Sequence, residues 1–287
     1  MLRPIDTRVP GAVESRVHSI CQRIFPKGEA AFVPRAFQWA SQCFAGQYAD
    51  YQPIDAGYHD FEHTLQGTLC LAYLLEGRHA AKVQPVLTQK MLELALLAIL
   101  LHDTGYLKKR SDREGTGAKY TLVHVGRSIA FAGGFLSQKG YPAEEVLSVQ
   151  NMIRCTGVNA DVQSIPFQSE LEKILGFALA TADLLGQMAA KDYVEKLPVL
   201  YQEFAEAARL NNDNASALAA FSSAEDLMRK TPAFWESYVF PRIQEEFGQL
   251  YLFLNDPYPA GPNHYLQRIE ECMGRLREKG ELKKDAR

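Results

Sequence analysis

The chain has 287 residues, of which 47% are hydrophobic, and it carries a formal net charge of -3 at pH 7. A chain of this length can bury a substantial core and lies near the upper limit for one domain. The mildly acidic balance provides no overall positive field for a nucleic-acid polymer or an anionic membrane, so neither is an expected partner. Any phosphate that the protein binds must be met by local charge.

The cysteines and the N-terminal sequence indicate the compartment. The five cysteines are odd in number and form no CxxC pair, which argues against a disulfide framework or a thiolate zinc cluster. The N-terminus has no apolar core like that of a signal peptide, and the longest apolar run, Leu94 to Leu101, is far too short to span a membrane. We therefore expect a soluble cytoplasmic protein.

Apolar residues recur at helical spacing along almost the whole chain, whereas alternating strand patterns are nearly absent. This periodicity predicts an all-α fold. Polar caps or early prolines mark helix starts at Thr88, Pro142 and Ser169. Helices are expected near residues 12–25, 30–46, 58–77, 88–102, 121–139, 143–155, 168–190, 192–210, 215–229, 232–252 and 263–279.

Two connecting segments differ from the helices in composition. Residues 107–121 are rich in charge and glycine, which predicts a mobile surface loop with little to bury, and residues 255–263 form a Pro/Gly turn before the last helix. We expect a single all-α domain over 1–287. Its core would lie at about 50–190 and a C-terminal helical extension at about 191–287.

Five of the seven histidines lie in the segment from Tyr58 to His124, and four of them, all but His79, are candidates for a site. His59 and His63 are four residues apart on one predicted helix, so both imidazoles should project from one face. A histidine pair of this kind is more often a surface or capping feature than a metal site. A functional interpretation therefore needs further residues.

Two aspartates lie in apolar helical surroundings. The run LLAILLHDTGY ends in His102 and Asp103, and Asp183 is the only charged residue in LGFALATADLLGQM. A buried carboxylate without a cationic partner is costly, and an acid at a helix C-terminus opposes the helix dipole. A divalent metal ion bound by imidazole and carboxylate groups would supply the missing cation.

His63, the His102–Asp103 pair and Asp183 together resemble the H…HD…D signature of the HD superfamily of metal-dependent phosphohydrolases. The resemblance implies a helical bundle with additional N- and C-terminal helices. It also implies that these four residues bind one or two divalent ions (Mn, Mg, Zn, Ni or Fe), and that metal-activated water hydrolyses a phosphoester. Asp103 would take part in catalysis as well, because its second oxygen can bridge to another ion.

Further residues take their expected roles from the same resemblance. His59 is similar to the general acid of the cyclic-nucleotide phosphodiesterase branch, whose motif begins Tyr-His and has the next histidine four residues on. His124 aligns with a position that serves a second metal or the substrate phosphate, although a lone histidine on a helix is as often structural. Arg127, three residues later on the same face, is a candidate phosphate ligand.

The sequence also departs from its relatives. Tyr106 stands where the cyclic-di-GMP branch has lysine, which disfavours that branch, and Cys155 or Thr156 stands where many members have another histidine. The expected substrate is a nucleotide or another small phosphorylated metabolite, as a monoester or a diester. A catalytically silent nucleotide-binding regulatory module and a di-iron oxygenase remain as alternatives, and a homodimer stays open.

Overall fold

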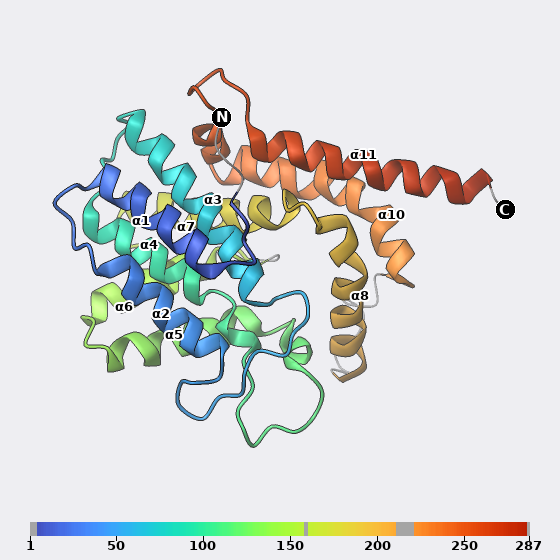
Figure 1. Cartoon of the computed structure of the whole chain (residues 1–287), viewed down its shortest axis with the longest axis horizontal. Helices are drawn as coiled ribbons and strands as arrows, with labels where there is room; N and C mark the ends of the chain where they lie inside the picture. Colours follow the sequence, from blue (N-terminus) through green and yellow to red (C-terminus); the bar gives the residue numbers. More distant parts are fainter. Residues whose placement is uncertain (1–4, 158–159, 211–220, 286–287) are drawn as a thin grey trace.

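The computed structural model describes residues 5–157, 160–210 and 221–285, with side chains as far as residue 280 (Figure 1). Within these ranges the chain forms helices and no β-strand, apart from two isolated bridges. The prediction of an all-α fold is confirmed. The α-helices are α1 (Pro10–Ile24), α2 (Phe32–Phe44), α3 (Phe61–Ala80), α4 (Gln89–Leu101), α5 (His124–Gln138), α6 (Ala143–Arg154), α7 (Glu170–Met188), α8 (Tyr193–Leu210), α10 (Ala224–Phe234) and α11 (His264–Asp285).

The centre of the molecule consists of α3, α4 and α7, which all pack against one another. Helix α1 packs on α3, α2 on α4, and α6 on both α4 and α7, with α5 against α6. Helix α4 is apolar on every side and is buried along almost its whole length from Leu92 to Leu101. A helix of that kind must lie in the core, which is why its C-terminal end is enclosed by other helices.

The C-terminal helices extend from one side of this body (Figure 1). Helix α10 packs on α8 and α11, and α11 reaches back to α7. The single helix expected at 232–252 is wrong, because α10 ends at Phe234 and is followed by two π-helical turns and a 3-10 helix at Leu250–Leu254. Pro232 and Pro241 lack the amide hydrogen that a regular helix needs there. The helix expected at 215–229 begins outside the described residues.

Residues 107–121 bury more than their composition suggests. Leu107, Lys108 and Ala118 are buried, and a short 3-10 helix spans Gly117–Tyr120. The ammonium group of Lys108 lies 3.0 Å from a carboxylate oxygen of Asp55. The expectation that this segment has little to bury is therefore wrong, because its charged residues find partners far away in the sequence. The turn expected at 255–263 is confirmed.

Two glycines let α3 and α7 cross in close backbone contact. A Cβ atom at Gly186 would lie 2.8 Å from backbone atoms of Gln66 and Gly67, and one at Gly67 would lie 3.5 Å from Cα of Asp183. Glycine inside a helix costs about 1 kcal/mol relative to alanine, so both positions indicate that the close approach matters. The crossing brings His63, one turn before Gly67, next to Asp183.

Candidate metal centre

His63 lies in the first turn of α3, which begins at Phe61 and so begins too late to include His59. Asp60 is the N-cap: it has an extended backbone and its carboxylate accepts a hydrogen bond from the backbone N–H of His63 at 2.8 Å. His59 therefore precedes the helix, and the expectation that His59 and His63 share one helical face is wrong. The two rings are nevertheless close, with centroids 5.2 Å apart.

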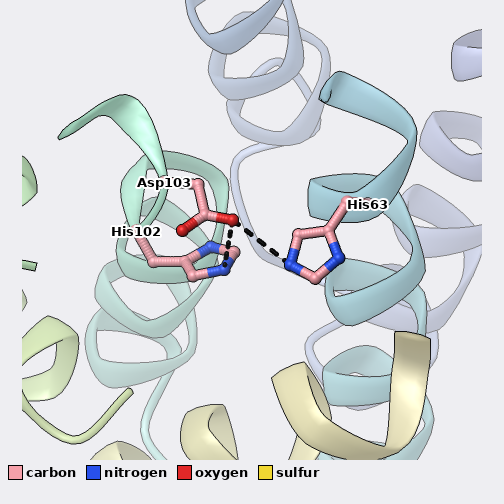
Figure 2. Close-up of side chains that lie close together, drawn as sticks. All are labelled: His63, His102 and Asp103. Atoms are coloured by element: carbon pink, nitrogen blue, oxygen red, sulfur yellow. Dashed lines mark ion pairs between the residues drawn. The ribbon is translucent and has the colours of Figure 1, made fainter. Parts of the chain in front are cut away.

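Four side chains from three helices converge in what we call the ligand centre: His63, His102, Asp103 and Asp183. Nε2 of His63 lies 3.2 Å from Oδ2 of Asp103 and 3.2 Å from Oδ1 of Asp183. Nε2 of His102 lies 3.2 and 3.3 Å from the same two oxygens. Figure 2 shows His63 on α3 facing the His102–Asp103 pair at the end of α4. The ligand atoms of these three residues all lie within 4.8 Å of one another.

The ligand centre fits a divalent cation. Nε2 of His102, Oδ2 of Asp103 and Oδ1 of Asp183 are buried and have no hydrogen-bond partner among the described residues. Ligand atoms about 2.1 Å from a metal lie about 3.0 Å apart at a right angle and about 3.4 Å apart at the tetrahedral angle. The four observed nitrogen–oxygen separations fall between these values, as they would for ligands of one ion.

The orientation of His102 also suits a metal ligand. Its Nδ1 lies 2.7 Å from the carbonyl oxygen of Ile99, which can only accept a hydrogen bond, so the ring hydrogen must be on Nδ1. In the neutral ring, Nε2 then keeps its lone pair and points it at two carboxylates. Metal-bound histidines usually donate their other N–H to such an acceptor, which fixes the ring.

Protons and a cation would compete for the ligand centre. Burial alone would lower the pKa of His63, but the carboxylates of Asp103 and Asp183 outweigh it and raise this pKa to about 9. The pKa of His102 is also well above its usual value, because the same carboxylates outweigh burial. Burial would raise the pKa of both aspartates, but the two imidazoles hold them well below the usual range. A metal ion would have to displace the protons, as at other metal sites.

A glutamate on α8 holds His59, and the sequence analysis missed it. Oε2 of Glu203 lies 2.6 Å from Nδ1 of His59, and Oε1 accepts hydrogen bonds from the backbone N–H groups of Tyr58 (2.7 Å) and His59 (3.3 Å). Burial would raise the pKa of Glu203, but the charge and hydrogen bond of His59 outweigh it and lower this pKa. The available signal was a glutamate on the buried face of α8, four residues before Ala207.

The structure places the other two candidates near Asp103 with different surroundings. Nδ1 of His124 lies 2.6 Å from the carbonyl oxygen of Thr121, and its Nε2 lies 3.9 Å from Oδ1 of Asp103. Arg127 donates to the backbone carbonyls of Gly105 (2.6 Å) and Leu107 (2.7 Å). These bonds engage Nε and Nη2 of Arg127 in holding the turn after Asp103, which favours a positioning role over phosphate binding.

Cys155 lies away from the ligand centre. A Cβ atom on Gly176 would lie 2.7 Å from Sγ of Cys155. Gly176 precedes Asp183 by about two turns of α7, which is about 10 Å along the helix axis. Cys155 is therefore not a further ligand of this centre.

A comparison with known proteins shows the family to which the chain belongs. Residues 32–256 match the model of one family over well more than half of the chain. The chain belongs to the Npun_R2479-like family. The match extends from α2 to beyond the 3-10 helix at Leu250–Leu254, so it includes the ligand centre and Glu203. No curated protein matches the chain.

Membership of the Npun_R2479-like family does not by itself name a reaction, because one fold can carry many activities. Among the described helices of this Npun_R2479-like protein, none has both the length and the apolar character that crossing a membrane requires. Its function must therefore be argued from the site.

Proposed function

We propose that this protein is a metal-dependent phosphohydrolase of the HD type, which cleaves a phosphoester of a nucleotide or another small phosphorylated metabolite. The observation that carries the proposal is the convergence of four ligand atoms at separations of 3.2–3.3 Å. Three of these atoms are buried without a hydrogen-bond partner among the described residues. Such a cluster is costly to bury unless it holds a cation or protons.

The side chains would divide the work. A bound divalent ion lowers the pKa of a coordinated water and polarises a phosphate oxygen. His63, His102 and Asp183 would hold the ion together with Oδ2 of Asp103. The other oxygen of Asp103 faces Nε2 of His124 at 3.9 Å, so that this pair is the candidate for a second ion or for the substrate phosphate.

His59 is the proposed general acid. Glu203 accepts the hydrogen on Nδ1 and so fixes the orientation of the ring. Nε2 of His59 makes no hydrogen bond to the described residues, so its proton is available to the leaving oxygen of a phosphoester. The ring remains partly accessible, with 15% of the side chain exposed.

The charges near the site favour a small substrate. Lys108 pairs with Asp55, and Arg127 is engaged by two backbone carbonyls. The charge of the scissile phosphate would be met mainly by the bound ion and by His59 and His124. We expect one reacting phosphate in a small molecule, since a polyanionic chain would need a wider basic surface.

Location and assembly remain proposals of the same kind. All five cysteines are free thiols, which supports a reducing cytoplasm. Light scattering would show whether the protein forms a homodimer.

Metal-dependent turnover tests the proposal directly. Protein stripped of metal and then resupplied with Mn²⁺, Mg²⁺, Zn²⁺ or Ni²⁺ should hydrolyse a generic aryl phosphomonoester or phosphodiester, and stripped protein should not. A panel of nucleoside mono-, di-, tri- and cyclic phosphates would then define the substrate. No turnover with any metal would contradict the proposal, and tight nucleotide binding without product would favour a silent regulatory module.

Two substitutions separate the proposed roles. Asp103→Ala should abolish Mn²⁺ binding and activity together, whereas His59→Ala should keep Mn²⁺ binding and lower kcat by about 100-fold, a typical contribution of a general acid. Calorimetric titration with Mn²⁺ and steady-state kinetics measure the two effects, and circular dichroism checks the fold. Identical behaviour of both variants would show that the roles are wrongly assigned.

A further inference from the structure

Tyr106 lies fully buried against two histidines of the site. Its ring centroid is 4.4 Å from that of His59, with an angle of 10° between the planes. It is 4.7 Å from the ring of His124, with an angle of 23°. Both distances and angles are those of offset stacking, the favoured arrangement of parallel aromatic rings.

The three distances place both imidazoles on the same face of Tyr106. The centroids of His59 and His124 are 6.1 Å apart. Rings on opposite faces would be separated by two stacking spacings of about 3.5 Å each, which gives about 7 Å or more. The imidazoles therefore lie side by side on one aromatic surface.

Each imidazole is also anchored at Nδ1. His59 is held by Glu203 at 2.6 Å, and His124 by the carbonyl oxygen of Thr121 at 2.6 Å. A single bond at Nδ1 still allows the ring to tilt about that contact. The flat surface of Tyr106 removes this freedom, so that both rings are fixed in position and in plane.

Tyr106 itself is rigidly placed by the turn that follows Asp103. The backbone N–H of Gly105 donates to the hydroxyl of Ser128 at 2.8 Å, and a Cβ atom at Gly105 would lie 2.0 Å from the carbonyl oxygen of His124. Arg127 donates to the carbonyls on both sides of Tyr106. These contacts fix the backbone on both sides of Tyr106, and the ring itself is fully buried.

We propose that Tyr106 is a positioning residue, whose aromatic face holds His59 and His124 side by side, with 32° between their planes, so that both present Nε2 to the same phosphoester. This inference rests on the proposed function. It assigns the role to the ring and not to the hydroxyl, since Tyr106 makes no hydrogen bond to either histidine. Phenylalanine should therefore replace it, and an aliphatic residue should not.

Kinetics of two variants test the role in the reaction. Tyr106→Phe should keep kcat within about twofold, whereas Tyr106→Leu should lower kcat by about 10- to 100-fold, the cost of displacing a reacting group by about 1 Å. KM and the affinity for Mn²⁺ should change little in both. An equal loss in both variants would overturn the proposal, because the hydroxyl would then be the important group.

NMR of the histidine side chains tests the geometry without any activity. The ring protons of His59 and His124 should be shifted upfield by the Tyr106 ring current, with assignments from His59→Gln and His124→Gln. Tyr106→Phe should keep both shifts and Tyr106→Leu should remove both. Unchanged shifts in Tyr106→Leu would overturn the proposal. Wild-type protein with these shifts but without turnover would contradict the proposed function only.

Phe135→Leu is the matched control for loss of a buried aromatic ring. Phe135 is buried in the core, where its ring contacts Trp39 and Tyr48 and is remote from the imidazoles. The variant should be less stable than the wild type but should keep kcat and both histidine shifts. A fall in kcat equal to that of Tyr106→Leu would mean that general loss of packing explains both results, and this would also overturn the proposal.

Discussion

The ligand centre and the region around α8 contrast in how their charges are held. In the ligand centre, acids and imidazoles lie at the ends or in the middle of apolar helices and are almost fully buried. The α8–loop region, which we define as α8 and residues 107–121, is joined by polar contacts at the edge of the molecule (Figure 1). Glu206 accepts hydrogen bonds from the backbone and side chain of Thr116, and Glu203 binds His59.

This contrast indicates in which region a substitution should destabilise the fold most. Removing one partner from a buried cluster of charges leaves the others uncompensated, which costs several kcal/mol. Exposed ion pairs and hydrogen bonds contribute at most about 1 kcal/mol each. The ligand centre should therefore respond to substitution strongly and as a unit, whereas the partly exposed contacts of the α8–loop region should respond weakly and one by one; the buried Glu203 is the exception.

The largest effect is expected for Asp183→Asn, which keeps the size of the side chain and removes its charge. The affinity for Mn²⁺ should fall more than about 100-fold, because even outer partners of metal ligands contribute about 10- to 100-fold. Calorimetric titration measures it. Glu172→Gln is the control, since Glu172 is also buried on α7 but bonds to Ser148 and Asn151. Equal losses in both variants would remove the distinction between the ligand centre and other buried acids.

Gly186→Ala tests the helix crossing that builds the ligand centre. The added Cβ would lie 2.8 Å from backbone atoms of Gln66, so the helices must shift, and the free energy of unfolding should fall by about 1–3 kcal/mol. Urea unfolding measures the loss. Gly134→Ala in α5 meets no atom within 4 Å and should be neutral or stabilising by up to about 1 kcal/mol. An unchanged free energy of unfolding in Gly186→Ala would mean that α3 and α7 can move apart without loss of stability.

Glu203→Gln tests whether the α8–loop region acts on the site. It should lower kcat about tenfold, because a neutral amide oxygen binds the Nδ1 hydrogen of His59 more weakly than a carboxylate and orients the ring less firmly, and it should leave Mn²⁺ affinity unchanged. Glu206→Gln, one turn later on α8, removes one of the two oxygens that accept from Thr116 but keeps the partner of His59. Its kcat should stay within about twofold of the wild type. A larger fall in kcat for Glu206→Gln than for Glu203→Gln would mean that α8 acts on the site through the loop and not through His59.

The smallest effect is a pH dependence at Asp112 in the loop. Burial would raise its pKa, but Lys119 and Tyr120 outweigh burial and lower the pKa to about 2. Because the folded pKa is depressed, the contribution to stability is complete above the usual value near 4 and disappears as the pH falls towards 2. Asp112→Asn should therefore reduce the free energy of unfolding by less than about 1 kcal/mol at pH 7, and by less at lower pH.

Urea unfolding from pH 2 to pH 7 measures this difference. Asp50→Asn is the control, because the exposed carboxylate of Asp50 forms no ion pair with the described residues. A difference for Asp112→Asn that stays constant down to pH 2 would contradict the assigned pairing.

The fold class and the four candidate ligands were accessible from the sequence for a common reason. Apolar periodicity reports burial, and Asp103 and Asp183 stand out because a charge is costly in an apolar helix. Glu203 and the partners of residues 107–121 were not accessible, since acids in polar surroundings are ordinary. The start of the helix expected at 58–77 was wrong, because Asp60 has an extended backbone and caps α3, so that His59 precedes the helix.

The sequence by itself determined that the chain is helical, and it predicted two histidines and two aspartates as candidate ligands of one cation. Only the tertiary structure decided how these residues meet, through the close crossing of α3 and α7 at Gly67 and Gly186. It also decided that Glu203 holds His59 and that Tyr106 lies under both imidazoles. The physical reason is that burial leaves a periodic signal along the chain, whereas a contact between distant side chains depends on how the helices pack.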